Sequence, residues 1–282
     1  MNVASTIARA RRHVSLARQN DCTVGLVPTM GALHAGHASL IETARENCVF
    51  LAVSIFVNPA QFGPNEDYEN YPRPMEKDLE LCRQLDVDMV FAPSANEMYP
   101  EKNLTWIQVE QLCENLCGAS RPTHFRGVTT VCAKLFNIIQ PDYAFFGQKD
   151  AQQSILIRKM VKDLNMPMEI VVCPTIREKD GLAISSRNKY LTPDQRKDAP
   201  LLYQSLQKAQ RLIQSGQKDP EKIRREMEAV LKKSAQINIE YIEIVNPDTL
   251  EPLEILTGPA LIAIAARLGQ ARLIDNIITK KP

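Results

Sequence analysis

The segment Pro28–His37 combines the residue types that are best suited to chemistry in this chain. It reads Pro-Thr-Met-Gly-Ala-Leu-His-Ala-Gly-His and lies between an apolar run, Thr23–Val27, and a stretch with helical apolar spacing, Ala38–Cys48. His34 and His37 therefore stand at the start of an expected helix, just after an expected strand. The amides and the dipole of a helix N-terminus favour a phosphate. Two imidazoles there would add N–H donors for the α- and β-phosphates of a nucleotide.

Other interpretations of this segment are weaker but remain open. Gly31 and Gly36 have the spacing of P-loop glycines, but His37 and Ala38 stand where a P-loop needs lysine and then serine or threonine. The dinucleotide fingerprint G-x-G-x-x-G is absent. A structural helix start or a two-histidine metal pair would also explain the histidines. Because the chain has only four histidines and two lie here, we favour nucleotide binding, with Gly36 leaving room for adenine beside the backbone.

Three further segments carry polar side chains of the same kind. In Phe146–Gln153, Lys149 is suited to meet phosphate and Asp150 is a good helix N-cap. Asp180–Asn188 combines two hydroxyls and an arginine in a glycine-containing loop, which suits a phosphate clamp, although a plain capping turn explains it nearly as well. Phe56–Phe62 carries neutral amides, which suit a ligand with hydroxyl groups better than a polyanion.

The elements that must position these segments alternate between strand-like and helix-like patterns. We expect further strands at Val49–Val57, Met89–Ala92, Tyr143–Phe146 and Met168–Val172, and further helices at Pro74–Leu85, Gly127–Ile139 and Ala151–Leu164. This alternation predicts an α/β fold with a doubly wound parallel sheet. Such sheets bind ligands beyond the carboxyl ends of their strands, and three of the four polar segments follow expected strands directly.

The pattern changes near residue 177, where a polar stretch without a long apolar run begins. After it we expect helices at Pro193–Gln214 and Pro220–Ser234 and strands at Ile239–Val245, Ala260–Arg267 and Ala271–Ile278. This order predicts a smaller α+β domain. Since 282 residues exceed the usual size of one domain, we expect two, at residues 1–176 and 177–282.

The overall charge excludes some classes of partner. Lys and Arg number 34 against 33 Asp and Glu, so the net charge is +1. The only dense basic cluster is Arg9, Arg11, Arg12 and His13, which we interpret as a solvated helix face. We therefore expect no nucleic-acid partner. We also expect no secretory signal and no membrane segment, because the longest apolar run, Val49–Val57, is far shorter than the roughly 20 residues that cross a bilayer.

The cysteines indicate a reducing compartment. The chain has seven, an odd number, and lacks a C-x-x-C motif, so we expect free thiols and a cytoplasmic protein. Cys113, Cys117 and His124 could in principle share a metal ion. A closed zinc site needs four ligands at recognisable spacing, so we favour buried thiols and expect no metal bound by protein side chains alone.

Taken together, these segments resemble a known family. H-x-G-H with a later hydroxyl-rich basic loop is the pattern of the nucleotidylyltransferases, which include the class I aminoacyl-tRNA synthetases. The longer words P-T-M-G-A-L-H-x-G-H, F-V-N-P-x-Q-F, H-F-R-G-V, F-F-G-x-K-D-x-Q-Q and D-G-L-A-x-S-S-R-N closely resemble the pantothenate synthetase family. The resemblance extends from about residue 24 to the terminal Ala-Arg-Leu-Ile-Asp-Asn. Gln148 and Ala151 depart from it, because many members have glutamate and an aromatic residue there.

The resemblance implies an enzyme that joins D-pantoate to β-alanine. Pantoate carboxylate attacks the α-phosphate of ATP to give pantoyl adenylate and pyrophosphate, and the amine of β-alanine then displaces AMP. No enzyme nucleophile is needed, so catalysis would rest on positioning and charge stabilisation. The resemblance also implies Mg²⁺ held mainly by the phosphates, a cytoplasmic homodimer, a Rossmann-like N-terminal domain and a C-terminal domain that closes as a lid.

The family's site residues map onto this chain as expectations. The expected ATP-binding residues are Met30, Gly31, Ala32, Leu33, His34, Ala35, Gly36, His37, Gly147, Gln148, Lys149, Asp150, Ile176, Ile184, Ser185, Ser186 and Arg187. Four of them are expected to be catalytic: His37 as proton donor, with His34, Lys149 and Arg187 sharing the charge of the transition state. Gln61 and Gln153 would bind pantoate, and Gln61 would also reach β-alanine. The loop Gly63–Met75 would exclude water from the acyl adenylate.

Three rival functions fit less of the sequence. A tRNA synthetase shares H-x-G-H, but this chain lacks K-M-S-K-S and a basic surface. A dinucleotide-forming adenylyltransferase has no use for the amides of Asn58, Gln61 and Gln153. A nucleotide sensor without catalysis would not need Lys149, His37 and Arg187 together.

Overall fold

The computed structural model describes residues 1–64 and 66–279. The chain divides into two compact units. Unit 1 comprises Met1–Cys113, Arg121–Gly147 and Leu156–Pro174, and unit 2 comprises Glu114–Ser120, Gln148–Ile155 and the chain from Thr175 onward. The chain therefore passes from one unit to the other several times.

Unit 1 contains a six-stranded parallel sheet. Its strands are β1 Asn2–Ala4, β2 Val24–Thr29, β3 Phe50–Ile55, β4 Met89–Phe91, β5 Tyr143–Gly147 and β6 Glu169–Cys173. Their order across the sheet is β1-β4-β3-β2-β5-β6. The order reverses at β2, because β3 lies on one side of it and β5 on the other. Such a reversal is the switch point at which doubly wound sheets bind ligands, and the predicted α/β fold is confirmed.

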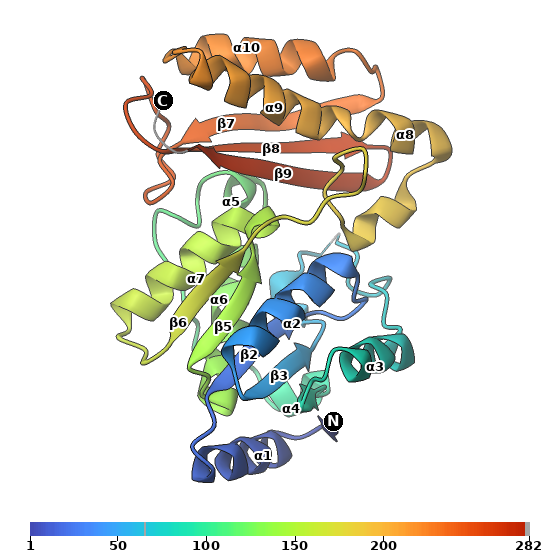
Figure 1. Ribbon diagram of the computed structural model, residues 1–282, viewed down its shortest axis with the longest axis vertical. Helices are drawn as coiled ribbons and strands as arrows, with labels where there is room; N and C mark the ends of the chain where they lie inside the picture. Colours follow the sequence, from blue (N-terminus) through green and yellow to red (C-terminus); the bar gives the residue numbers. More distant parts are fainter. Residues whose placement is uncertain (65, 280–282) are drawn as a thin grey trace. The chain divides into compact units, whose positions relative to one another are not determined.

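Helices cover both faces of this sheet (Figure 1). They are α1 Ile7–Gln19, α2 Ala35–Asn47, η1 Pro59–Gln61, α3 Met75–Gln84, α4 Ala95–Met98 and α6 His124–Ile139, together with α7 Ala151–Asp163, which begins in unit 2 and continues in unit 1. Leu26 of β2 packs in a core with residues of α1 and α6, whereas Val27 packs in a second core with residues of α2. Burial on both faces explains why β3 is a nearly continuous apolar run.

Two features of unit 1 differ from the expectation. β2 runs through Pro28 and Thr29, where a loop was expected. This is possible because β2 pairs with β5 only at Gly25 and Leu26, so Pro28 lies beyond the part of the strand that has two neighbours. β1 was not expected, since three residues are too few for a pattern, and α1 was expected only as the solvated face that carries the basic cluster.

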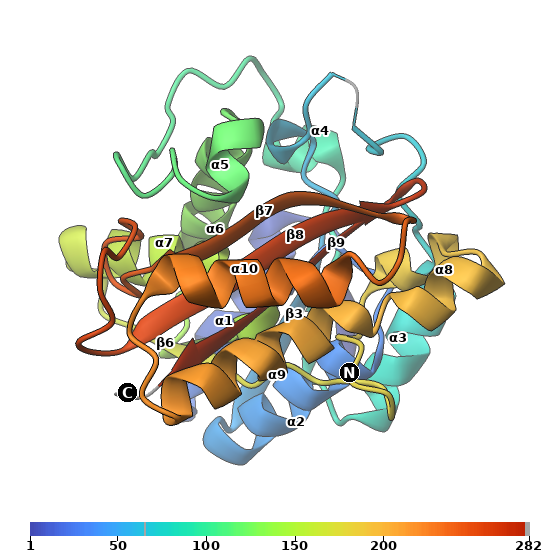
Figure 2. The ribbon, with the colours of Figure 1, turned by 90° about the horizontal axis from the view of Figure 1, so that it is seen from above.

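Unit 2 contains a three-stranded antiparallel sheet in the order β7-β8-β9. Its elements are α5 Cys117–Ser120, η2 Gln148–Asp150, η3 Ser186–Tyr190, α8 Pro193–Asp198, α9 Leu201–Gln214, α10 Pro220–Leu231, β7 Ile237–Val245, β8 Ala260–Leu268 and β9 Ala271–Thr279. α9 and α10 lie side by side on this sheet (Figure 2), and their apolar residues share one core with it. The predicted α+β arrangement is confirmed.

The expectation of one helix over Pro193–Gln214 is wrong, because α8 and α9 are separate. Pro200 lies between them. Proline lacks the N–H that would continue the helical ladder, so the hydrogen bonding breaks there although Ala199 and Pro200 both keep helical backbone angles. The turn between β8 and β9 is tight, and Gly269 adopts a φ of 58° there, which suits glycine.

Some features of the described residues bear on the class of protein. No helix in residues 1–64 and 66–279 is long and apolar enough to cross a membrane. The cysteines at all seven positions are free thiols, and six of them are buried. Within the same residues there is no group of three or more His, Cys, Asp or Glu side chains that could hold a metal ion.

Candidate active site

His34 and His37 cap the start of α2 reciprocally. His34 is the N-cap residue, and its Nδ1 accepts a hydrogen bond from the Gly36 amide at 3.1 Å. The Nδ1 of His37 accepts one from the His34 amide at 3.3 Å, and the two ring centroids are 4.1 Å apart. In a neutral imidazole the nitrogen that accepts carries no proton. The capping bonds therefore assign the proton of both rings to Nε2, which makes each Nε2–H a donor.

The structure thus shows the structural interpretation of H-x-G-H, a helix start, and leaves nucleotide binding as a prediction. Each ring satisfies a backbone amide at the helix start and keeps an N–H on its other nitrogen. Gly36 has a local role that we did not predict. A Cβ on Gly36 would lie 3.0 Å from Cε1 and 3.1 Å from Nδ1 of His34, so glycine makes room for the capping ring.

Asp78 of α3 orders the loop that precedes the histidines. Its Oδ2 accepts from the Ala32 amide and its Oδ1 from the Leu33 amide, both at 2.8 Å. The loop needs this support because Ala32 has a φ of 50°, which is unfavourable for a residue with a Cβ. Asp78 is buried, and the loss of solvation raises the pKa of its carboxyl although the two amides act in the opposite direction. Both amides are therefore engaged by Asp78.

Gln61 is held in a buried amide network at the end of β3. Asn58 donates from Nδ2 to Gln61 Oε1 at 3.1 Å and to the Gly127 carbonyl at 3.1 Å. The Nε2 of Gln61 donates to the sulfur of Met30 at 3.0 Å. Tyr99 donates its hydroxyl proton to Asn58 Oδ1 at 2.9 Å. The network brings Gln61, expected at the acid site, together with Met30, expected at the ATP site.

A glycine in α6 allows the helix to approach this network closely. A Cβ on Gly127 would lie 2.2 Å from the carbonyl oxygen of Ala60, inside η1. Only glycine permits that contact. The adjoining loop is anchored as well, because Arg121 donates from Nε to Glu66 at 2.6 Å. Burial opposes the charged form of Glu66, but Arg121, the Gly63 amide and His124 together lower the pKa of this carboxyl.

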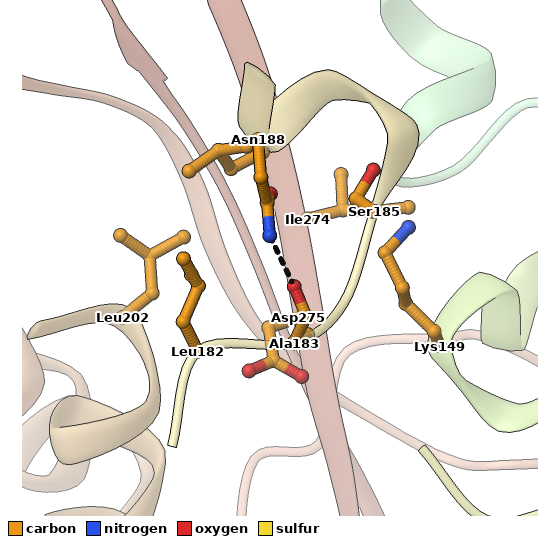
Figure 3. Close-up of a pocket in the computed structure, with 9 residues that line it drawn as sticks. Lys149, Leu182, Ala183, Ser185, Asn188, Leu202, Ile274 and Asp275 are labelled. Atoms are coloured by element: carbon orange, nitrogen blue, oxygen red, sulfur yellow. Dashed lines mark hydrogen bonds between the residues drawn. The ribbon is translucent and has the colours of Figure 1, made fainter. Parts of the chain in front are cut away.

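Unit 2 carries the other expected site residues, and two of them line one cavity (Figure 3). Lys149 follows β5, Ser185 belongs to the hydroxyl-rich loop, and both face this cavity with Asn188 and Asp275. Its remaining lining residues are Leu182, Ala183, Leu202, Leu273 and Ile274. Lys149 Nζ also lies 3.8 Å from a carboxylate oxygen of Asp150.

The loop around Ser185 has the capping geometry that was expected as the simpler alternative. Ser185 is the N-cap of η3, and its hydroxyl oxygen accepts from the Arg187 amide at 3.3 Å. The loop is closed by a backbone hydrogen bond from Ile184 to Ile176 at 3.0 Å, which brings two expected ATP-binding residues together. In the described part of the chain, the Oδ1 of Asn188 is buried without a hydrogen-bond partner. It is therefore an acceptor that a water molecule in this small cavity could satisfy.

The adjacent glutamines Gln152 and Gln153 at the start of α7 differ in their burial. Gln152 is buried, accepts from the Cys117 amide at 3.0 Å and donates to the Asn115 carbonyl at 2.7 Å. Its side chain therefore fixes the segment Glu114–Ser120 within unit 2. Gln153 is half-buried, as suits a side chain that meets a ligand.

The structure separates the expected residues into two groups. Met30 to His37, Gln61 and Gly147 belong to unit 1, and Gln148 to Asp150, Gln153, Ile176 and Ile184 to Arg187 belong to unit 2. Within unit 1 it joins His34 with His37, and Gln61 with Met30. Within unit 2 it joins Lys149 with Ser185. Asp78 was missed by sequence analysis, because a single aspartate in a helix carries no motif.

Comparison with known proteins identifies the family of this chain. A sequence model of the family described as pantoate-beta-alanine ligase matches residues 2–278. A pantothenate synthetase from Moorella thermoacetica is 53% identical over 278 residues, which are 99% of this chain and 98% of that protein.

Solved structures agree as well. The crystal structure of a pantothenate synthetase from Thermus thermophilus matches with a TM-score of 0.93 at 47% identity, over 98% of this chain and 99% of that one. A pantoate-beta-alanine ligase from Francisella tularensis, in complex with beta-gamma ATP and beta-alanine, matches with a TM-score of 0.80 at 36% identity, over 99% and 97%. The fold and the matches define an enzyme of the ligase class. The chain belongs to the pantoate-beta-alanine ligase family.

Proposed function

We propose that this ligase joins D-pantoate to β-alanine through pantoyl adenylate. In the first step a pantoate carboxylate oxygen attacks the α-phosphorus of ATP, and the bond to the β-phosphate breaks to release pyrophosphate. In the second step the β-alanine nitrogen attacks the acyl carbon, the acyl–phosphate bond breaks to release AMP, and the amine loses a proton. Membership of the family supports this reaction, as does the relative that was solved with beta-gamma ATP and beta-alanine.

The observation that carries the proposal is the reciprocal capping of His34 and His37. The capping bonds commit both Nδ1 atoms to the backbone, and so both rings offer an Nε2–H at the start of the helix that follows the central strand β2. Negative charge grows on the phosphate oxygens as pyrophosphate leaves. Donors that are already oriented stabilise such charge without reorganisation. We assign His37 as the proton donor.

Lys149 and Arg187 complete the proposed catalytic set. Lysine is a compact charge that suits a phosphate, and an arginine adds a planar set of donors. Lys149 lines a cavity beside Ser185 and the unsatisfied Oδ1 of Asn188. We propose that residues of both units bind ATP, as the resemblance implies.

The proposed cation is Mg²⁺ carried by the triphosphate. Mg²⁺ commonly binds through substrate phosphates and water with one or two carboxylates. We therefore assign the ion mainly to the phosphates, as the resemblance implies. It would neutralise charge on the phosphate oxygens.

The acid pocket is proposed at Gln61 and Gln153, with Gln61 also reaching β-alanine. Gln61 is buried and oriented by Asn58, which keeps its amide in one position. We further propose that Gly63–Met75 shields the acyl adenylate from water, that residues 177–282 form a lid domain, and that the protein is a cytoplasmic homodimer.

Pantoate-dependent pyrophosphate exchange tests the proposal. With ATP, Mg²⁺ and D-pantoate but no β-alanine, labelled pyrophosphate should enter ATP. An exchange that requires an amino acid and tRNA, or that proceeds without pantoate, would reject this function in favour of its rivals.

A further inference from the structure

Two polar residues lie buried in β9, within the terminal sequence Ala-Arg-Leu-Ile-Asp-Asn. Asp275 is 3% exposed and Asn276 is 4% exposed. Burial of a carboxylate and an amide is costly unless both are fully bonded. Neither residue has a part in the function proposed above, so their bonding partners indicate what they do.

The side chain of Asn276 holds the backbone that carries Lys149. Its Nδ2 donates to the carbonyl oxygen of Gln148 at 3.0 Å and to that of Lys149 at 2.9 Å. Its Oδ1 accepts from Nε2 of Gln148 at 2.9 Å. Because a carbonyl can only accept, the two carbonyl partners fix the orientation of the amide. The two hydrogens of the side-chain amide therefore bond to the carbonyls of two consecutive residues.

The side chain of Asp275 fixes Arg177, which precedes the hydroxyl-rich loop Asp180–Asn188. Its two oxygens accept from Nη1 and Nη2 of Arg177, at 2.5 and 2.9 Å. The guanidinium of Arg177 also donates to the Gly181 carbonyl at 3.1 Å and stacks over the ring of Tyr203, 3.7 Å from its centroid. Such a bidentate ion pair fixes the orientation of the guanidinium as well as its distance from the carboxylate. Asp275 also accepts from the backbone amide of Asn276 at 2.8 Å, so its side chain is bonded to the strand beside Asn276.

The strand that carries Asp275 and Asn276 is held in place along its whole length. β9 pairs with β8 without interruption from Ala271 to Thr279. Lys149 lies in η2, a turn of three residues that leads directly into α7. Its carbonyl accepts a hydrogen bond from a residue 127 positions away in the chain, which ties this turn to the strand.

We propose that Asp275 and Asn276 are positioning residues for adenylation, which keep Lys149 and the loop of Ser185 to Arg187 in the arrangement that the α-phosphate requires. The proposal rests on the catalytic role assigned to Lys149. Misplacing a catalytic group by about 1 Å can cost roughly a hundredfold in rate. The amide of Asn276 restrains the two peptide groups from which the lysine side chain extends.

A double-mutant cycle separates positioning from plain stabilisation. Asn276→Asp keeps the shape and one acceptor but removes both donors, and Lys149→Ala removes the ammonium. We expect Asn276→Asp to slow single-turnover formation of pantoyl adenylate by about tenfold to a hundredfold. In the Lys149→Ala background the same change should have less than about a twofold effect, because no ammonium remains to be misplaced. The KM for pantoate should stay within about twofold of the starting protein.

Controls make each outcome decisive. Asn238→Asp applies the same chemical change to an exposed residue of β7 and should leave the rate unchanged. Should Asn276→Asp fail to fold, Asn276→Ser removes the amide without adding a charge and enters the same cycle. Equal effects of the Asn276 change in both backgrounds, or no effect in either, would overturn the positioning role alone. A Lys149→Ala protein with an unchanged adenylation rate would overturn the role of Lys149 and the inference together.

Discussion

His37 Nδ1 accepts a hydrogen bond from the backbone amide of His34, and His34 Nδ1 accepts one from the backbone amide of Gly36, which lies between them in the chain. The relationship uses the Nδ1 of each ring at the helix start, and the proposed function uses the Nε2–H. Stability and catalysis should therefore respond to different substitutions at the same position.

The nucleotide products test the overall reaction. A reaction at the α-phosphate releases AMP and pyrophosphate in amounts equal to the pantothenate formed. Quantifying both nucleotides and both forms of phosphate checks this prediction. ADP and inorganic phosphate as stoichiometric products would show that the γ-phosphate is attacked instead.

The proposed acid pocket predicts a selective defect. Gln61→Ala and Gln153→Ala each leave a polar group of pantoate unpaired, at a cost of about 1–3 kcal/mol. We expect the affinity for pantoate to fall by that amount while the affinity for ATP changes little, measured by titration calorimetry. Gln84→Ala, on the exposed face of α3, is the matched control. Equal losses of pantoate and ATP affinity would contradict the assignment.

The close approach of α6 to η1 predicts a stability defect. Gly127→Ala would place a Cβ 2.2 Å from the Ala60 carbonyl oxygen, so the helix must shift. Overpacking of this kind costs about 1–3 kcal/mol or more, which should lower the urea midpoint clearly. Gly258→Ala is the control, because a Cβ there meets nothing within 4 Å. Similar midpoints for the two variants would show that α6 does not contact η1 this closely.

The ion pairs of Arg196 predict a pH dependence of stability. Arg196 donates to Asp180 and Glu178, both at 2.6 Å, and its hydrogen bond is the main reason why the pKa of Asp180 lies below its ordinary value. A carboxyl with a lowered folded-state pKa stabilises the fold above its unfolded pKa of about 3.9 and loses this contribution as the pH falls further.

Arg196→Gln should therefore lower the urea midpoint at pH 7 and lower it by less near pH 3, because the contribution of Asp180 is lost as the pH falls below its unfolded pKa of about 3.9. The groups are partly exposed, so the loss should not exceed about 1 kcal/mol per pair. Lys197→Gln, whose pair with Asp194 is fully at the surface, should have a smaller effect. If Arg196→Gln lowered the urea midpoint by the same amount at both pH values, the ionisation of Asp180 would not be linked to this ion pair.

The sequence predicted most of the fold because the elements around the core have strong periodicity. The apolar stripe of α2 and the continuous apolar run of β3 both appear where they were expected. β1 was missed because it has three residues, and the break between α8 and α9 depends on one proline inside an otherwise helical pattern.

The candidate site was predictable where its residues adjoin one another in the chain. His34 and His37 form such a local pair, and Ser185 acts on Arg187 two positions away. Asp78 and Asn276 were not predictable as supports. They bond to Ala32 and Lys149 across 46 and 127 positions, and only the folded backbone brings them there.

The central claim is tested most directly by single-turnover formation of pantoyl adenylate in His37→Asn and His37→Ala. The asparagine can still accept from the His34 amide, so its melting temperature should stay close to that of the starting protein, whereas alanine loses a capping bond worth about 0.5–2 kcal/mol. Both variants lack the Nε2–H, and both should slow adenylation by at least about a hundredfold. Both should be less impaired when given preformed pantoyl adenylate and β-alanine. A folded His37→Asn protein that forms pantoyl adenylate at the original rate would contradict the account.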